Sequence, residues 1–455
     1  MKIKTPGFIV PGLVTGEQIT NRKFAVHEKM PDGSWRTRET FEFATPDGKG
    51  VFVPMEKTLW SSAGLPIEYE NETKLFQEII EFVKKHEPLR DLNAYENLAA
   101  FTFATYRMEE FSITPYLNLL GPRGTGKTRL MELLAAVCYR GWFVTHPSPA
   151  SVYYVVDRYA PTLLADNYEF WSKESRRELD GLFNAGYRAG TVVPRRPKDE
   201  NGGNELEVYR VFCPKVISGT REPSDALGSR CIRIRTARAS EPVPMFVDSE
   251  WAARLRGELL AYRFKHFETP LQKDQELMNQ YWRVGEIFYP LLTIAPDETA
   301  ARKIAEFASG IYNEEVEEEA ASFDAEVVKA ILNAQTLAIG GKLAVTQIVD
   351  QFNNGRDDDE KVNSRRLGWA LRRLGFRKAR LSDKTATRAI ELDKGLLEHL
   401  QRTYNASAVS VKSAISDIKG ESVPDTPLGT HPQPPKTPET QETTETTVTI
   451  KGGVS

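Results

Sequence analysis

The chain has 455 residues, so we expect about two to four structural units rather than a single core. Its 60 basic and 63 acidic residues give a formal net charge of -3, so any nucleic-acid partner has to be argued from local basic patches. With 40% hydrophobic residues the composition excludes a fibrous protein, and no apolar run approaches the roughly 18 residues of a membrane helix. We expect a cytoplasmic protein without membrane contact, because prolines and glycines break the first apolar run.

Short extended segments separated by turn residues fill the start of the chain. Pro-Asp-Gly turns at 31–33 and 46–48 flank segments at 38–43 and 50–53. We therefore predict a small β-rich N-terminal module over 1–66. Apolar residues at helical spacing follow, and they predict a helical collar or linker over 67–114.

Short apolar runs then alternate with helical patterns. The runs lie at 116–120, 142–145, 162–165, 211–218 and 231–235. Such alternation is typical of a mostly parallel sheet covered by helices. We predict an α/β core with a parallel sheet over 115–240 and a helical lid over 241–312.

The C-terminal part divides into three segments. The acidic run 314–319 predicts an exposed linker over 313–322, because like charges in series repel one another. Helical patterns at 324–332, 345–352 and 364–374, with an extended basic pair of segments in 376–392, predict a winged-helix-like domain over 323–405. Residues 412–455 are poor in apolar residues, so we predict a disordered tail.

A phosphate-binding motif follows the first predicted strand of the core. Gly121 to Thr128 have the sequence G-P-R-G-T-G-K-T, a complete Walker A loop. Glycines are needed because the main chain must curl until successive N–H groups face the phosphates. We expect Lys127 to contact the β- and γ-phosphates, and the next helix to direct its dipole at them. The predicted ligand is ATP, held by Gly121, Pro122, Arg123, Gly124, Thr125, Gly126, Lys127, Thr128 and Arg129.

An acidic residue ends the predicted strand at 162–165. We expect this residue, Asp166, to hold Mg²⁺ together with the hydroxyl of Thr128. Asn167 follows at the position where a glutamate commonly polarises the attacking water, and Glu169 is a substitute two residues further on. The identity of the residue that polarises the attacking water is thus left open between Asn167 and Glu169.

Two further side chains complete the predicted chemistry. Thr220 ends the strand expected between the two phosphate-site strands, where it could orient the lytic water. Arg230 is expected to enter the nucleotide site of a neighbouring subunit and stabilise the transferring phosphoryl group. Arg221 is the competing candidate for that role, and a surface arginine that caps a turn is the alternative reading of Arg230.

This order of elements resembles the AAA+ ATPases, most closely the phage- and plasmid-encoded branch that includes superfamily 3 replicative helicases. The likeness covers about residues 70–260 and is carried by Y-L-N-L-L-G-P (116–122), S-P-A (148–150), P-T-L-L-A-D (161–166), L-F-N-A-G-Y-R-A-G (182–190), P-K-V-I-S-G-T (214–220) and D-A-L-G-S-R (225–230). It implies a homo-oligomer, often a hexameric ring, with ATP bound between subunits.

The resemblance also implies a hairpin that grips DNA inside the ring. Segments 191–193 and 205–209 are expected to pair across the Asn- and Gly-rich tip at 198–204. Arg195, Arg196 and Lys198 would contact the phosphates of single-stranded DNA. The alternative is a solvated loop whose charges serve solubility.

The predicted helix 364–374 and the wing after it form a second basic region. Helix spacing leaves several arginines outside the core, and the wing adds more cations: Arg365, Arg366, Arg372, Arg373, Arg377, Lys378, Arg380, Lys384 and Arg388. A basic helix beside a basic hairpin suits DNA contacts. Winged helices also bind proteins, so that alternative stays open.

These features predict an ATP-hydrolysing motor on nucleic acid, such as the replicative helicase or initiator ATPase of a phage, plasmid or other mobile element. One alternative is an AAA+ switch that loads or remodels proteins on DNA, which slow hydrolysis at a site with Asn167 would suit. The other is a DNA-binding scaffold whose phosphate loop holds ATP with little turnover.

Overall fold

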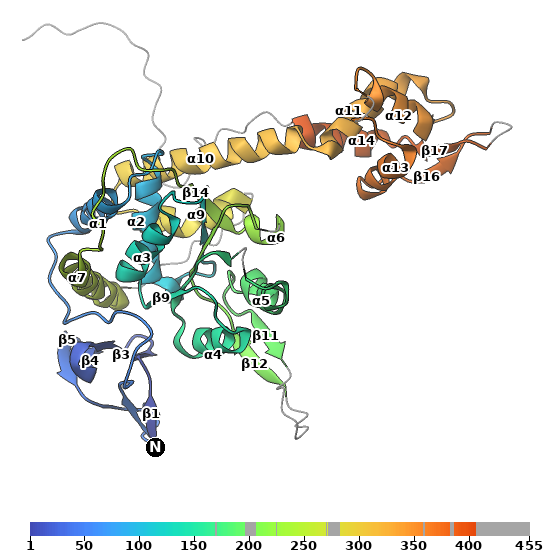
Figure 1. Ribbon diagram of the computed structural model, residues 1–455. Helices are drawn as coiled ribbons and strands as arrows, with labels where there is room; N and C mark the ends of the chain where they lie inside the picture. Colours follow the sequence, from blue (N-terminus) through green and yellow to red (C-terminus); the bar gives the residue numbers. More distant parts are fainter. Residues whose placement is uncertain are drawn as a thin grey trace, which may run out of the picture.

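The computed structural model describes residues 1–168, 171–195, 206–223, 225–269, 271, 283–357, 360–382 and 386–405. Along these residues the chain forms two small N-terminal sheets, a parallel sheet between helices, and a C-terminal unit carried at the far end of one long helix (Figure 1). The predicted disordered tail lies outside the described residues. No described helix is both long enough and apolar enough to cross a membrane.

Strands dominate the first part of the chain, as predicted for residues 1–66. An antiparallel sheet has the order β2-β3-β4-β5 and consists of β2 (Gly7–Val10), β3 (Val14–Ile19), β4 (Lys23–Lys29) and β5 (Trp35–Thr40). A smaller sheet has the order β1-β7-β6 and consists of β1 (Lys2–Lys4), β6 (Phe43–Ala44) and β7 (Val51–Val53). Ile19 and Ala25 pack against Leu260 and Phe264 of the main body.

Five parallel strands form the central sheet. Their spatial order is β14-β8-β13-β10-β9, with β8 (Tyr116–Leu120), β9 (Gly141–Val144), β10 (Thr162–Ala165), β13 (Lys215–Gly219) and β14 (Cys231–Arg235). Almost every residue of β8, β10 and β13 is buried, as expected when helices cover both faces of a sheet. The predicted parallel α/β core is confirmed. Because β13 lies between β8 and β10, the carboxyl ends of these strands meet at one edge.

One predicted strand begins too early. The sequence predicts a strand over 211–218, whereas β13 begins at Lys215, so the prediction is wrong for 211–214. Pro214 has no N–H to donate to a ladder. The main-chain oxygens of Val211 and Cys213 accept hydrogen bonds from the Lys215 ammonium instead, at 3.1 and 3.0 Å.

Helices cover both faces of the sheet. One face carries α3 (Lys127–Val137) and, packed into the same core, α1 (Glu72–His86), α2 (Ala94–Thr105), α7 (Ser249–Glu268), α9 (Arg283–Ile294) and α10 (Glu298–Ala320). The other face carries α4 (Pro149–Tyr159) and α5 (Lys173–Ala185), and the short α6 (Asp225–Gly228) precedes β14. Every residue of α2 is buried, which explains why its sequence has no polar stripe.

The acidic run 314–319 forms the last turns of α10. Most of it is exposed, as predicted, but it is helical and paired rather than a free linker. Arg235 donates to Glu314 at 2.8 Å, and Arg233 lies 3.4 Å from Glu318. These arginines supply counter-charge from positions 79 and 85 residues earlier, which a local charge pattern cannot reveal.

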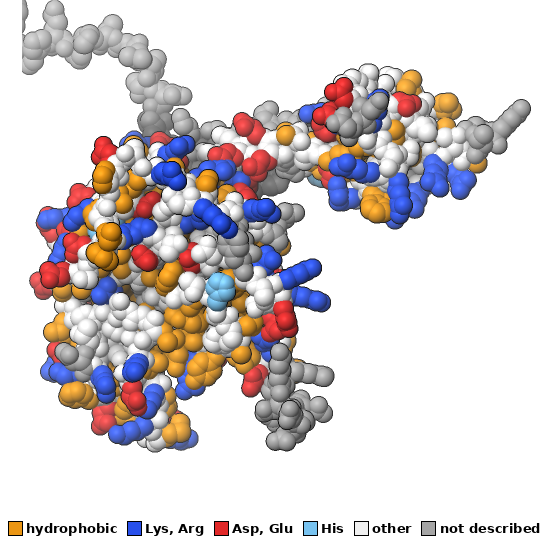
Figure 2. Space-filling model, viewed as in Figure 1, with side chains coloured by type: hydrophobic (Ala, Val, Ile, Leu, Met, Phe, Trp, Pro, Cys, Tyr) orange, Lys and Arg blue, Asp and Glu red, His pale blue; other side chains and the backbone are white. Residues whose placement is uncertain are grey.

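The C-terminal unit has a hydrophobic core of its own. It consists of α11 (Phe323–Ala334), β15 (Lys342–Ala344), α12 (Val345–Asn353), α13 (Ser364–Arg373), β16 (Lys378–Arg380), β17 (Arg388–Glu391) and α14 (Lys394–Asn405), with an antiparallel sheet in the order β15-β17-β16. The helices predicted at 324–332, 345–352 and 364–374 are present. Figure 2 shows Lys and Arg side chains gathered along one edge of this unit.

Candidate functional site

The Gly-rich loop connects the end of β8 to the start of α3, as its motif predicts. Gly124 and Gly126 have φ angles of 74° and 83°, a left-handed backbone that strains other residues. A Cβ on Gly126 would also lie 1.9 Å from Oε1 of Glu87, so the loop has no room for a side chain there. The positive φ angles and the close approach of Glu87 therefore both favour glycine in this curled loop.

Lys127 points into this curl rather than into solvent. It is 7% exposed, and its ammonium donates to the main-chain oxygens of Gly121 and Pro122 at 2.6 and 2.7 Å. Thr125 donates to the oxygen of Pro122 at 2.8 Å, and its hydroxyl lies 2.8 Å from that of Thr236. The cation is thus held at the centre of the loop, where an incoming phosphate would meet it.

A chain of hydrogen bonds connects the start of α3 with the ends of β10 and β13. The hydroxyl of Thr128 donates to Oδ2 of Asp166 at 3.1 Å, and the side-chain amide of Asn167 donates to the same oxygen at 2.8 Å. Ser218 donates to Oδ1 of Asp166 at 2.6 Å. The three side chains bound to Asp166 thus fix both of its oxygens. The site comes together because β10 and β13 are neighbours and end at the same edge as β8.

A cavity of about 540 Å³ opens over the loop. Its wall contains Arg123 to Arg129 together with His146, Asn167 and Thr220. The structure therefore brings Thr220 to the same cavity as the predicted phosphate-binding residues. Glu169, the alternative carboxylate, lies outside the described residues.

Sequence analysis missed Ser218 as a site residue. It is buried, with 1% of its surface exposed, at the end of a strand whose other residues are mostly apolar. Besides binding Asp166, its oxygen accepts a hydrogen bond from the main-chain N–H of Asn167 at 2.9 Å. The available signal was a polar residue in an otherwise apolar strand directly before the predicted Gly219-Thr220 tip.

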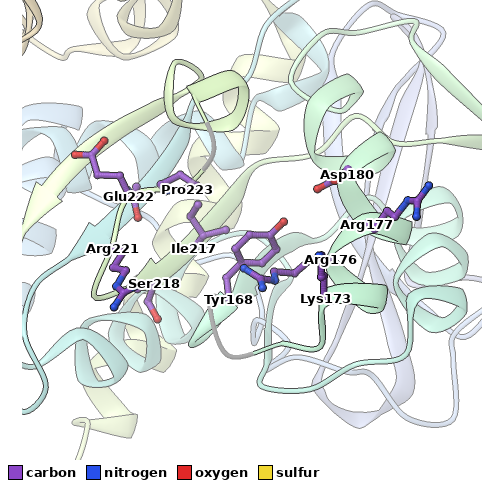
Figure 3. Close-up of a pocket in the computed structure, with 12 residues that line it drawn as sticks. Tyr168, Lys173, Arg176, Arg177, Asp180, Ile217, Ser218, Arg221, Glu222 and Pro223 are labelled. Atoms are coloured by element: carbon purple, nitrogen blue, oxygen red, sulfur yellow. The ribbon is translucent and has the colours of Figure 1, made fainter. Parts of the chain in front are cut away.

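A second cavity of about 430 Å³ adjoins the first at the tip of β13, where Ser218 and Gly219 line it. Its other lining side chains include the cations Lys173, Arg176, Arg177 and Arg221 (Figure 3). Tyr168 stands beside Arg176 in this view, and burial raises its pKa to about 12. Arg221 therefore lies at the same edge of the sheet as the phosphate loop of its own chain.

Arg230 lies at the opposite end of the parallel strands, where β8 and β14 begin. Its main-chain oxygen accepts from the N–H of Tyr116, the first residue of β8, at 3.2 Å. The phosphate loop follows the last residue of that strand, so the length of β8, roughly 15 Å, separates Arg230 from it. The Arg230 guanidinium lies 4.8 Å from the ring centre of Tyr187 and donates to the oxygen of Ala226. It is too far away to serve the nucleotide site of its own chain.

The predicted hairpin is present. β11 (Val192–Arg195) and β12 (Glu207–Arg210) pair antiparallel, with Val193 opposite Tyr209, and project from the main body (Figure 1). Arg196, Lys198 and the tip lie outside the described residues. Arg195 donates to Glu178 at 2.8 Å and lies 4.4 Å from the ring centre of Tyr153, so its own chain already engages this predicted DNA contact.

The buried ammonium of Lys215 is hydrogen-bonded to the chain on both sides of the hairpin. Lys215 is fully buried and donates to the main-chain oxygen of Gly186 at 3.3 Å, and also to the oxygens of Val211 and Cys213. Gly186 precedes the hairpin and Val211 follows it. Burial lowers the pKa of Lys215. Sequence analysis missed this residue, because no local pattern indicates that a lysine inside a strand bonds to main-chain oxygens on both sides of a hairpin.

A buried carboxyl lies behind the phosphate loop. Glu87 is 3% exposed and directly follows α1, and its side chain fills the space beside Gly126. Burial raises the pKa of Glu87 to about 7, while the nearby Arg129 acts to lower it. Arg129 is also bound to the main-chain oxygens of Pro244 and Met245. Protonation of Glu87 therefore changes the charge next to the loop near neutral pH.

The basic residues of the C-terminal unit differ in what they contact. Arg373 pairs with Asp324, and Arg366 lies 4.6 Å from the ring centre of Phe323, so both turn toward α11. Other predicted cations are exposed along α13, β16 and β17: Arg365, Arg372, Arg377, Lys378, Arg380 and Arg388. Lys384 lies outside the described residues.

The described residues contain no cluster of three or more His, Cys, Asp or Glu side chains able to hold a metal ion. A Mg²⁺ site at Thr128 and Asp166 would therefore rest on one carboxylate, one hydroxyl, phosphate oxygens and water, as is usual beside a bound nucleotide.

Comparison with protein-family models gives no match, and neither does comparison with curated proteins. Among solved structures, the apo C-terminal region of NrS-1 aligns with 85% of this chain and 100% of its own, at 11% identity and a TM-score of 0.32. An active helicase, SCCmec type IV Cch, aligns with 82% of this chain and 79% of its own, at 13% identity and a TM-score of 0.36. A ligand-bound JCV helicase aligns with 58% and 66%, at 11% identity and a TM-score of 0.24. These similarities are too distant to support an argument, so the parallel α/β core and its phosphate-loop site stand on this chain's own geometry.

Proposed function

We propose that the chain is an ATP-hydrolysing motor of the AAA+ type that acts on nucleic acid, as the replicative helicase or initiator ATPase of a mobile element does. The observation that carries this proposal is the hydrogen-bonded set of Thr128, Asp166 and Ser218 beside a Gly-rich loop with Lys127 at its centre. Phosphate loops need a curled backbone, one cation, one hydroxyl and one carboxylate at this edge of a parallel sheet. A cytoplasmic location is part of the proposal.

The residues present fit ATP and Mg²⁺. The Lys127 ammonium donates to two main-chain oxygens of the loop, and exchanging these for phosphate oxygens would give stronger, charge-assisted bonds. Thr128 and Asp166 lie within 3.1 Å of each other, and both are oxygen donors of the kind that Mg²⁺ prefers. The metal would neutralise charge on the phosphates. Thr220 lines the same cavity, and we assign it to orient the attacking water.

The position of Arg230 supports assembly. The main-chain oxygen of Arg230 is bound at the first residue of β8, and the phosphate loop follows the last residue of that strand, so this arginine is available to a neighbouring copy rather than to its own loop. We propose a homo-oligomeric ring, hexameric as the AAA+ resemblance implies, in which Arg230 stabilises the transferring phosphoryl group of the next subunit. Arg221 lies beside its own site and fits that role in trans less well.

Two surfaces are proposed to contact nucleic acid, with single-stranded DNA as the expected form. The hairpin of β11 and β12 projects from the main body, and Arg196 and Lys198 follow β11 in the sequence. The C-terminal unit combines helices, a three-stranded antiparallel sheet and exposed cations, and these features support a winged helix that binds nucleic acid. Phosphate contacts of this kind bind DNA strongly and in a salt-dependent way.

Purified protein tests the proposal in an ATPase assay with and without single-stranded DNA and in a strand-displacement assay. We expect hydrolysis that single-stranded DNA stimulates, together with displacement. Lys127→Ala should abolish nucleotide binding, whereas Lys329→Ala, an exposed lysine on α11, should behave as wild type. Nucleotide binding that survives Lys127→Ala would contradict the site.

A slow AAA+ switch that loads or remodels proteins on DNA is a second candidate. It is favoured by Asn167, whose amide is bound to Asp166 at the position where motors commonly have a glutamate. ATP-dependent assembly without strand displacement would support the switch. ATP binding without turnover, with DNA binding unchanged by Lys127→Ala, would instead indicate a scaffold.

A further inference from the structure

A tryptophan stands in solvent at the middle of the basic helix α13. Trp369 is 62% exposed, although Trp is usually well buried. Leu367, Ala370 and Leu371 of the same helix are buried in the core of the C-terminal unit. The core therefore fixes the rotation of α13 and directs Trp369 outward, so the indole takes no part in holding this unit together.

Cations flank the indole along the helix. Arg365 and Arg372 lie four residues before and three residues after Trp369, which places all three on one face of α13. The guanidinium of Arg365 lies 5.5 Å from the centre of the Trp369 ring. A cation over an aromatic face at this distance is attracted by the ring and holds it in place. The exposed ring is thus partly pre-positioned.

The segments that follow α13 in the chain are also basic. Arg377, Lys378, Arg380 and Arg388 are exposed on and beside β16 and β17, and among the described residues of 360–391 the exposed carboxylates are Glu360 and Glu391. In Figure 2 a hydrophobic area interrupts the cluster of Lys and Arg side chains at the edge of the C-terminal unit. This combination of aromatic surface and positive charge is complementary to a polyanion with flat apolar faces.

We propose that Trp369 stacks on an unpaired base of a nucleic-acid strand whose phosphates are held by Arg365 and Arg372 and by the cations of β16 and β17. This assignment rests on the proposed action on nucleic acid and names the part of the strand that α13 would recognise. A single strand offers both phosphates and free base faces. A duplex offers phosphates and base edges, because its base faces are covered by their neighbours.

The stacking role predicts a loss of affinity that depends on the form of the DNA. We expect Trp369→Ala in the full chain to weaken binding of a single-stranded oligonucleotide by about 10-fold, because stacking on an aromatic ring stabilises each bound base. Binding of a blunt duplex of the same sequence should change by less than about twofold. Trp369→Phe keeps a ring and should retain most of the single-strand affinity. Fluorescence anisotropy with labelled oligonucleotides measures all three.

Matched variants separate stacking from charge and from folding. Ile339→Ala removes another exposed hydrophobic side chain of the C-terminal unit, next to β15 at the other edge of its sheet, and should leave both affinities unchanged. Arg372→Gln should lower the salt dependence of single-strand binding by about 0.7 per lost phosphate contact, whereas Trp369→Ala should keep the slope. Circular dichroism of each variant checks that the fold is retained.

The stacking assignment is overturned if Trp369→Ala weakens single-strand and duplex binding equally, which would indicate groove or general contacts. It is also overturned if neither affinity changes, which would indicate that the exposed indole binds a protein partner instead. Both results are distinguishable from failure of the proposed function, because in that case wild-type protein would bind no oligonucleotide and its ATPase activity would not respond to DNA.

Discussion

Ser218 donates its hydroxyl hydrogen to Oδ1 of Asp166 across 2.6 Å, and so joins the tips of two neighbouring strands, β13 and β10. The other carboxylate oxygen accepts from Thr128 and Asn167. Because both oxygens are engaged, Asp166 cannot rotate freely. The orientation of the candidate metal ligand therefore depends on a serine that belongs to neither of the two sequence motifs of the site.

Ser218→Ala should lower the ATPase turnover number by about 10-fold while nucleotide affinity changes little. The lost bond is charge-assisted, and bonds to a carboxylate contribute about 1.5–3 kcal/mol. In the proposed site ATP is held mainly by the loop, which the substitution leaves intact. Steady-state kinetics with a nucleotide-binding titration measures both quantities. Ser309→Ala, which removes a half-buried hydroxyl on α10, is the control. Unchanged turnover in Ser218→Ala would remove Ser218 from the site.

Arg230→Ala should bind ATP normally and lose turnover, because the guanidinium is proposed to act on the nucleotide of the adjacent subunit. A mixing experiment tests the location. Arg230→Ala subunits keep their phosphate loop and Lys127→Ala subunits keep their arginine, so mixed oligomers should regain part of the activity that each variant lacks alone.

The control for that experiment is Arg158→Ala, since Arg158 is an exposed arginine that also lies over a tyrosine ring. It should remain active. If mixing restores nothing although mixed oligomers form, Arg230 does not act between subunits.

Glu87→Gln should change how stability depends on pH. The pKa of Glu87 is raised by burial from 4.5 to about 7, so the folded state retains a proton that the unfolded state has lost. The contribution of this carboxyl to stability is complete below pH 4.5 and is lost as the pH rises through about 7. Between pH 5 and pH 8, wild type should lose about 2 kcal/mol more stability than Glu87→Gln.

Thermal unfolding of both proteins across this pH range measures the difference. Glu81→Gln, an exposed carboxyl on the same helix α1, should follow wild type at every pH. Parallel curves for wild type and Glu87→Gln would mean that Glu87 is already ionised and solvated in the folded protein.

Arg233→Met should loosen the C-terminal half of α10. Arg233 is 7% exposed and lies 3.2 Å from Glu222, 3.4 Å from Glu318 and 3.6 Å from Glu315. Its loss leaves these carboxylates to repel one another, which we expect to cost about 2 kcal/mol because the cation is buried. Glu318→Gln should cost less than about 1 kcal/mol, since that carboxylate is mostly exposed. Hydrogen exchange of residues 314–320 should quicken in Arg233→Met and hardly change in Glu318→Gln.

Much of the core was predictable because local sequence encodes burial and backbone geometry. The strands at 116–120, 162–165 and 231–235 have the predicted bounds, since buried apolar residues recur along each of them. The Gly-rich loop was predictable for a similar reason, because φ angles of 74° and 83° at Gly124 and Gly126 favour one residue type. The strand predicted at 211–218 failed where Pro214 removes a ladder donor.

Partnerships between distant side chains were not predictable. Arg195 was expected to be available for DNA, yet it is bound to Glu178, and the acidic run 314–319 finds its counter-charge on β14. Trp369 lies inside a helical pattern whose apolar residues suggest a core, and only the packing of Leu367 and Leu371 directs it outward.

The sequence by itself determined a phosphate loop between a strand and a helix, with an acidic residue at the tip of a later strand, because these features depend on residue type and local spacing. Only the tertiary structure decided that Ser218 fixes Asp166, that Glu87 fills the space behind Gly126, and that Arg230 lies at the other end of β8 from its own loop. These relationships depend on which strands become neighbours, and strand order is a property of the packed chain rather than of any local segment.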